Sequence, residues 1–141
     1  MNKILFLDVD GVLNTARTIA YQNTALALDP YMVLLVDRIV QATGCKVVLS
    51  SSWRYEEQAS ALVMKAVPFI DTTPKNQGLT SRGTEIKEWL SKHPEVEKYA
   101  ILDDATDFLD DQKPNFFRTF WEKGLTEEIA DKVIKHLKGD E

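Results

Sequence analysis

The chain has 141 residues, of which 44% are hydrophobic and 28% are charged, and its formal net charge is −5. This length and composition favour a single globular domain over residues 1–141 and exclude a disordered chain. Short apolar runs, acidic residues near the N-terminus and a single cysteine argue against a membrane span, a signal peptide and disulfides, so we expect a cytoplasmic protein with no membrane partner.

The first half of the chain alternates between strand and helix patterns. A continuous apolar run at residues 4–7 predicts a strand that is buried on both faces. Helical spacing then runs from a predicted N-cap at Asp29, with proline in the first helical position, to Gly44. A second apolar run at residues 47–49 predicts another buried strand, and residues 55–66 have the pattern of a second helix.

The second half of the chain continues this alternation. The predicted elements are a strand at residues 69–72, a loop at 71–83, a helix marked by Ile86, Trp89 and Leu90, a strand at 99–102, a loop at 110–115, a strand at 116–120 and a helix capped by Thr126. Strands that alternate with helices predict an α/β fold with a three-layer, doubly wound (Rossmann-like) parallel sheet.

Polar residues follow three of the predicted strands, at the point where each strand ends. Asp8 and Asp10 follow the first strand, Ser50 follows the second, and Asp103 and Asp104 follow the third. Because ligands bind beyond the carboxyl ends of strands in an open parallel sheet, we expect these residues to meet at one edge. Carboxylates next to a buried strand are costly unless something neutralises them, which a hard divalent cation such as Mg²⁺ does.

The three strand ends carry recognisable motifs at residues 6–14 (FLDVDGVLN), 47–50 (VVLS) and 101–104 (ILDD). In this order they resemble the first, second and fourth motifs of the haloacid dehalogenase-like (HAD) phosphohydrolase superfamily. The resemblance implies a Mg²⁺-dependent phosphatase. It also implies a HAD core without a cap domain, because the intervals between the motifs are too short to hold a large one.

The resemblance also implies a role for each of these residues. Asp8 is expected to be the nucleophile, to form an aspartyl-phosphate and to ligate Mg²⁺. Asp10 is expected to transfer protons and to ligate the ion through its backbone carbonyl. Ser50 is expected to hydrogen-bond a phosphoryl oxygen, and Asp103 and Asp104 to complete the Mg²⁺ site.

The third motif of the superfamily is a lysine or arginine that steadies the phosphoryl group, and two residues of this chain match it. Arg82 is favoured because it stands at a predicted helix start, where its charge and the helix N-terminus both attract an anion. Lys87, which lies farther along the same helix, is the alternative.

Residues 50–54 (SSSWR), 82–86 (RGTEI) and 124–128 (GLTEE) further resemble the HAD domain found in Swiss Army Knife RNA repair proteins. We therefore expect substrate contacts from Asn14, Ser51, Trp53 and Arg54, with Trp53 stacking on a base and Arg54 pairing with a phosphate. Three of these residues have a structural alternative: Ser51 as a helix cap, Trp53 as a packing residue and Asn14 as a turn residue.

The expected function is hydrolysis of a phosphomonoester through an aspartyl-phosphate. The expected substrate is phosphorylated, and a nucleic-acid end, a nucleotide and another small phosphomonoester all remain open. The acidic balance counts weakly against tight binding of a polyanion. A receiver-like or HAD-fold phospho-binding module without efficient turnover is the alternative, although receiver domains place their paired acids and their acceptor aspartate in the opposite order.

Overall fold

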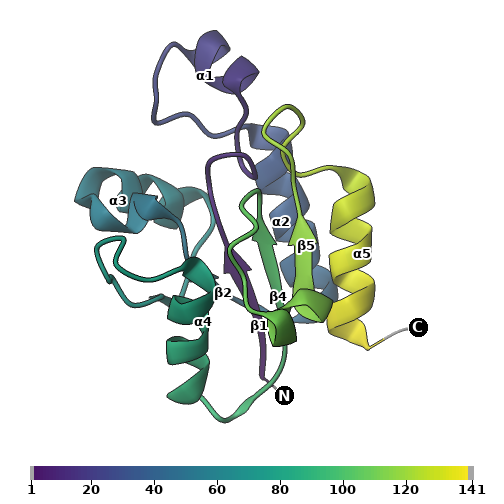
Figure 1. Cartoon of the computed structure of the whole chain (residues 1–141). Coiled ribbons are helices and arrows are strands. Elements are labelled where there is room, and N and C mark those ends of the chain that lie inside the picture. Colours follow the sequence, from purple (N-terminus) through teal and green to yellow (C-terminus); the bar gives the residue numbers. More distant parts are fainter. Residues whose placement is uncertain (1, 140–141) are drawn as a thin grey trace.

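The computed structural model describes residues 2–139 and has a sheet of five parallel strands at its centre, in the order β3-β2-β1-β4-β5 (Figure 1). The strands are β1 (Asn2–Leu7), β2 (Lys46–Leu49), β3 (Asp71–Thr72), β4 (Val96–Asp103) and β5 (Phe116–Arg118). The predicted α/β fold with a parallel sheet is therefore confirmed.

Helices cover both faces of the sheet and complete three layers (Figure 1). They are α1 (Ala16–Gln22), α2 (Pro30–Thr43), α3 (Glu57–Ala66), α4 (Arg82–Ser91) and α5 (Glu127–Lys138), with the short 3-10 helices η1 (Ser52–Tyr55) and η2 (Asp110–Asn115). On one face, α2, α3 and α5 pack against strand residues that include Leu5 and Leu7. On the other face, Ile86 and Trp89 of α4 pack against Phe6. Both faces of β1 are thus buried, as its continuous apolar run predicts.

The direction of winding reverses at β1. The chain passes from β1 through α2 to β2 and through α3 to β3, whereas α4 leads back to β4 on the other side of β1. Leu7 of β1 pairs with Leu102 of β4, so these two neighbouring strands end at the same level. A doubly wound sheet binds its ligands in the crevice at such a reversal, beyond the carboxyl ends of the strands.

The predicted signals at the ends of two helices are confirmed. Asp29 caps α2 by accepting a hydrogen bond from the backbone N–H of Tyr31, and Pro30 is the first helical residue. Gly44 ends α2 with a φ of 73°, in the left-handed region that favours glycine. Thr126 caps α5 by accepting from the backbone N–H of Ile129.

Three predicted elements are divided or shorter in the structure. The helix expected at residues 55–66 is divided into η1 and α3, because Glu56 between them has an extended backbone. The strand expected at residues 116–120 ends at Arg118, because the chain turns at Phe120. Strand β3 likewise covers only half of its expected range. Strands β3 and β5 lie at the two edges of the sheet, where few neighbours reinforce an extended backbone.

Helix α1 is present in the structure but is not predicted from the sequence. Thr15 and Thr18 form a capping box at its N-terminus, and Thr18 is the one buried residue of the helix. Because α1 buries no apolar stripe, it lacks the periodicity by which a helix is found in a sequence. The loop expected at residues 110–115 likewise contains η2.

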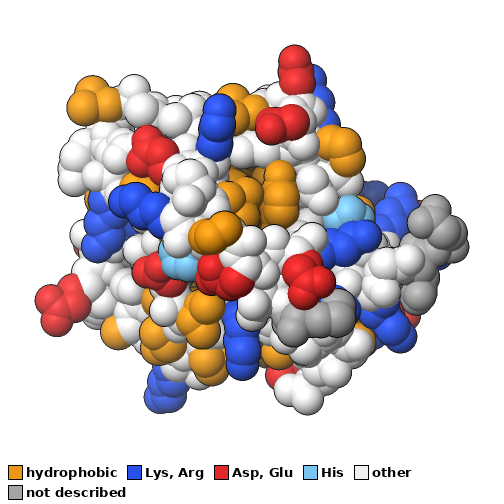
Figure 2. Space-filling view, turned by 90° about the horizontal axis from the view of Figure 1, so that it is seen from below, with side chains coloured by type: hydrophobic (Ala, Val, Ile, Leu, Met, Phe, Trp, Pro, Cys, Tyr) orange, Lys and Arg blue, Asp and Glu red, His pale blue; other side chains and the backbone are white. Residues whose placement is uncertain are grey.

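The edge of the molecule at the amino ends of the strands is a mixed surface. In Figure 2, which looks onto this edge, acidic and basic side chains are interspersed, with hydrophobic side chains between them. Among the described residues, no helix has the length and apolar character needed to span a membrane. The polar residues that follow the strands lie at the opposite edge of the molecule.

Candidate active site

Three carboxylates converge at the carboxyl ends of β1 and β4. The backbone N–H of Asp8 donates to the carbonyl of Leu102 at 3.0 Å, which extends the β1–β4 pairing by one residue and aligns Asp8 with Asp103. Carboxylate oxygens of Asp8, Asp103 and Asp104 all lie within 4.8 Å of one another. The structure thus brings Asp8 together with Asp103 and Asp104, whereas the side chain of Asp10 is not part of this cluster.

Arg82 contacts this cluster from the other side of the crevice. It is the first residue of α4, and its Nη1 lies 3.1 Å from Oδ1 of Asp8 and 2.6 Å from Oδ2 of Asp103. Lys87 lies on the same helix but is exposed to solvent. Of the two matches to the third motif, Arg82 is therefore the one that reaches the carboxylates.

Burial and mutual repulsion shape the acid–base properties of the cluster. Burial, with the adjacent charge of Asp103, raises the pKa of Asp8 well above its ordinary value of 3.8, although Arg82 partly opposes this. The same two causes raise the pKa of Asp104. Burial disfavours the charge of Arg82, but the carboxylates of Asp8 and Asp103 outweigh it and raise the pKa of the guanidinium. When all three acids are ionised, one guanidinium leaves the site with excess negative charge.

This donor set fits Mg²⁺. Asp8 and Asp103 are buried, so their charges have little water to solvate them, and one guanidinium compensates only part of the charge. Carboxylate oxygens are the ligands that Mg²⁺ takes in proteins, usually one or two at a time. Asp8, Asp103 and Asp104 could therefore hold the ion, with their oxygens already grouped within 4.8 Å.

Ser50 lies at the end of β2, next to Asp8. Its backbone N–H donates to the carbonyl of Leu7 at 3.0 Å, and the residue is buried. Its hydroxyl has no hydrogen-bond partner among the described residues. Because a buried hydroxyl without a partner is uncommon and costly, this atom is available to a group that enters the crevice.

Asp10 lies two residues beyond Asp8 and has hydrogen-bond partners of its own. Asn14 donates through Nδ2 to Oδ1 of Asp10 at 3.0 Å, and the indole Nε1 of Trp53 donates to Oδ2 at 3.1 Å. Both of these side chains are buried, so the stacking of a base on Trp53 does not agree with the structure. Asn14 and Trp53 therefore hydrogen-bond Asp10, a candidate catalytic residue, and are not exposed for contact with a substrate.

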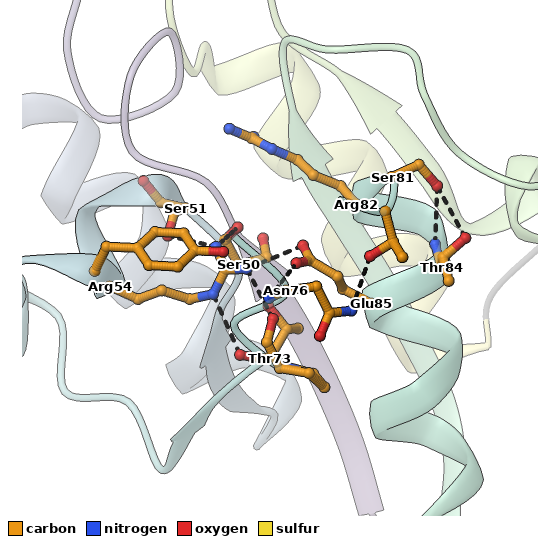
Figure 3. A network of polar contacts seen from close by, with 12 residues as sticks. Ser50, Ser51, Arg54, Thr73, Asn76, Ser81, Arg82, Thr84 and Glu85 are labelled. Atoms are coloured by element: carbon orange, nitrogen blue, oxygen red, sulfur yellow. Dashed lines mark hydrogen bonds and ion pairs between the residues drawn. The ribbon is translucent and has the colours of Figure 1, made fainter. Parts of the chain in front are cut away.

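Arg54 also differs from its predicted role. Its guanidinium donates four hydrogen bonds, to the backbone carbonyls of Ser50, Ser51, Thr73 and Pro74 (Figure 3). The guanidinium also forms an ion pair with Glu85, whose Oε1 lies 2.9 Å from Nη2. A buried guanidinium that these contacts hold is not presented to a substrate phosphate, so the structure does not support this prediction.

The predicted contact of Ser51 with substrate is likewise not supported. Its hydroxyl accepts the backbone N–H of Trp53 at 3.1 Å and caps η1, which agrees with the structural alternative. Ser51 is also buried. Together with Arg54, this cap fixes the loop that follows β2 and carries Ser50.

Glu85 has a structural role in this region that the sequence analysis does not predict. It is buried on α4, accepts from the backbone N–H of Asn76 at 3.3 Å and pairs with Arg54 (Figure 3). A signal exists in the sequence, because Glu85 precedes the buried Trp89 by four residues and so lies on the inward face of the helix. An acid in such a position requires a partner.

Comparison with known families agrees with this geometry. Residues 4–130 match the family described as the HAD domain in Swiss Army Knife RNA repair proteins. The chain belongs to this family. The match begins within β1 and includes the other four strands and all the strand-end residues described above, and the HAD family indicates a phosphohydrolase. Neither the curated proteins nor the solved structures contained a match to this HAD domain.

Proposed function

We propose that this HAD domain is a Mg²⁺-dependent phosphomonoester hydrolase that works through an aspartyl-phosphate on Asp8. The observation that carries the proposal is the convergence of Asp8, Asp103, Asp104 and Arg82 at the ends of β1 and β4. A buried carboxylate beside an arginine and a candidate cation site has the arrangement needed to attack a phosphoryl group, because the surrounding positive charge offsets that of the phosphate.

In the first step, a carboxylate oxygen of Asp8 attacks phosphorus, and the bond from phosphorus to the leaving oxygen breaks. Asp10 gives its proton to the leaving oxygen, a contribution typically worth about 10²–10⁴-fold. Arg82 and the free hydroxyl of Ser50 bind the phosphoryl oxygens as charge moves onto them.

In the second step, a water molecule attacks phosphorus and gives its proton to Asp10. The bond between phosphorus and the Asp8 oxygen breaks, which restores the carboxylate and releases inorganic phosphate. Bound Mg²⁺ would supply charge neutralisation in both steps. Asp8, Asp103, Asp104 and the backbone carbonyl of Asp10 would hold the ion.

The proposed substrate is a phosphorylated molecule that enters an open crevice. The segments between β1 and α2 and between β2 and α4 contain only α1, η1, α3 and β3, which leaves the edge of the sheet accessible to large substrates. The family description refers to RNA repair, so we include a nucleic-acid end among the candidate substrates, beside a nucleotide and another small phosphomonoester.

The test is phosphate release from an aryl phosphate and from a 3′-phosphorylated oligonucleotide, with Mg²⁺ and with EDTA. We expect turnover that requires Mg²⁺ and is abolished by Asp8→Asn. Equal rates for the wild type and Asp8→Asn would contradict the assignment of the nucleophile. A long-lived phosphoprotein without turnover would instead favour a phospho-binding module.

A further inference from the structure

The carboxylate of Asp10 is held from two sides by buried N–H donors. Asn14 donates to Oδ1 at 3.0 Å, and Trp53 donates to Oδ2 at 3.1 Å. One donor comes from the turn after β1, and the other comes from η1 after β2. Two donors on different oxygens fix the plane of a carboxyl group, which a single donor would leave free to rotate.

Both donors are themselves held in place. Asn14 accepts the backbone N–H of Gly11 at 3.1 Å and donates to the carbonyl of Ala27 at 3.0 Å, which fixes its amide. Trp53 is only 7% exposed and belongs to η1, which Ser51 caps at its N-terminus. The next residue, Arg54, donates to the carbonyls of Ser50 and Ser51, which directly follow β2. The position of the indole is therefore tied to the same strand end that carries Ser50.

We propose that Trp53 is a positioning residue that orients the Asp10 carboxyl group for proton transfer to the leaving group. This role rests on the proposed function, in which Asp10 is the proton donor. A general acid has to lie within hydrogen-bond reach of the atom that it protonates. Misplacement of a catalytic group by about 1 Å can cost about 10²-fold in rate, so a fixed carboxyl plane has catalytic value.

This role has a chemical signature that depends on the leaving group. A nitrophenolate leaves readily without a proton, whereas an aliphatic alkoxide leaves slowly unless it is protonated. Loss of the indole N–H should therefore slow the hydrolysis of an alkyl phosphate much more than that of an aryl phosphate. A residue that only supports the fold would affect both substrates equally.

The first test compares Trp53→Phe with the wild type on 4-nitrobenzyl phosphate and 4-nitrophenyl phosphate, in the presence of Mg²⁺. We expect kcat/KM to fall by about tenfold for the benzyl ester and by less than about twofold for the phenyl ester. Replacement of Trp53 with benzothienylalanine, which has the size of tryptophan but lacks the N–H, should reproduce this result. It also keeps the test valid where phenylalanine leaves a cavity.

The chain offers a matched control in Trp89→Phe. Trp89 is also buried, and its indole N–H donates to Oδ2 of Asp71 at 2.8 Å, outside the carboxylate cluster. Its substitution removes the same kind of hydrogen bond, so we expect a similar loss of stability and an unchanged ratio of kcat/KM between the two substrates.

A second test needs no activity. The three tryptophans of the chain should give three indole N–H signals in a ¹H–¹⁵N spectrum. We expect Asp10→Asn to shift the signal of Trp53 and to leave that of Trp89 in place.

A third test combines the two substitutions. In the Asp10→Asn background, Trp53→Phe should cause no further loss of kcat/KM on the benzyl ester, because the two residues act together.

The outcomes separate this inference from the proposed function. Equal losses on both substrates, or no loss on either, would overturn the role of Trp53 and leave the phosphatase in place. An unmoved Trp53 signal in Asp10→Asn would also overturn it. Hydrolysis that continues unchanged in Asp8→Asn would overturn the proposed function, and the role of Trp53 with it.

Discussion

Arg54 and Glu85 form a buried ion pair, with Nη2 of Arg54 2.9 Å from Oε1 of Glu85 and with side chains that are 3% and 5% exposed. The pair connects the loop after β2, which carries Ser50, to helix α4, which begins with Arg82. The ion pair therefore fixes the positions of Ser50 and Arg82, the two residues proposed to bind phosphoryl oxygens, relative to each other.

Glu85→Gln is expected to destabilise the fold strongly, because it leaves the buried guanidinium of Arg54 without a compensating charge. Loss of one partner of a buried pair typically costs about 3–5 kcal/mol. The free energy of unfolding from urea titration measures this loss. The control is Asp131→Asn, which breaks the exposed pair of Arg38 and Asp131 and should cost less than about 1 kcal/mol. Similar losses in both variants would contradict the structural role of the buried pair.

The stability of the metal-free protein should depend on pH through Asp8. Its pKa is raised in the folded state, so above its ordinary value of 3.8 the folded protein retains a proton that the unfolded chain releases. The contribution of Asp8 to stability is therefore fully present below that value and is lost as pH rises toward the folded pKa. Asp8→Asn removes this effect, so in EDTA its stability relative to wild type should rise as the pH increases above about 4. A difference that does not change with pH would contradict the raised pKa.

Mg²⁺ should stabilise the protein at neutral pH, because it neutralises carboxylates that are costly to ionise. At a concentration about 100 times its dissociation constant, the ion should add about 2.7 kcal/mol to the free energy of unfolding. Asp103→Asn should remove most of this increase in a thermal or urea titration. Asp111→Asn, which alters an exposed acid outside the cluster, should retain it. Equal loss in both variants would exclude the carboxylate cluster as the metal site.

Gly11 is expected to be essential to the position of Asp104. Its φ is +83°, and a Cβ at this position would overlap the carboxylate of Asp104. Gly11→Ala should therefore weaken Mg²⁺ binding, measured by calorimetry. Gly44→Ala is the control, because Gly44 has a similar φ of +73° and no heavy atom lies within 4 Å of an added Cβ. Both variants should lose about 1–2 kcal/mol of stability from backbone strain, but only Gly11→Ala should lose metal affinity. Equal affinities would contradict the close packing of Gly11 on Asp104.

The sheet and the acidic cluster could be predicted from the sequence because both depend on local patterns. Continuous apolar runs indicate buried strands, and parallel strands bring their carboxyl ends to one edge whatever the connecting segments are. The positions of Asp8 and Asp103 follow from these two facts. Arg82 could be preferred over Lys87 because it stands at the start of a helix that points toward the crevice.

The roles of Arg54 and Trp53 could not be predicted in the same way. An arginine and a tryptophan that follow a strand are residue types that bind phosphates and bases. Whether they are buried, however, depends on residues far along the chain. The partner of Arg54 is 31 positions away in α4, and Trp53 bonds to Asp10 across 43 positions. Such long-range hydrogen bonds leave no periodic signal, although the inward position of Glu85 on its helix indicates that a buried charge needs a partner.

The measurement that tests the central claim most directly is the detection of phosphate on Asp8 during turnover. The wild type is mixed with an aryl phosphate and Mg²⁺, quenched in acid within the first turnover, digested and analysed by mass spectrometry. We predict a phosphorylated peptide that contains Asp8. The phosphopeptide should disappear when the substrate is used up before the quench, and it should be absent in Asp8→Asn. Turnover with no phosphate on Asp8, or an unchanged rate in Asp8→Asn, would contradict the proposed mechanism.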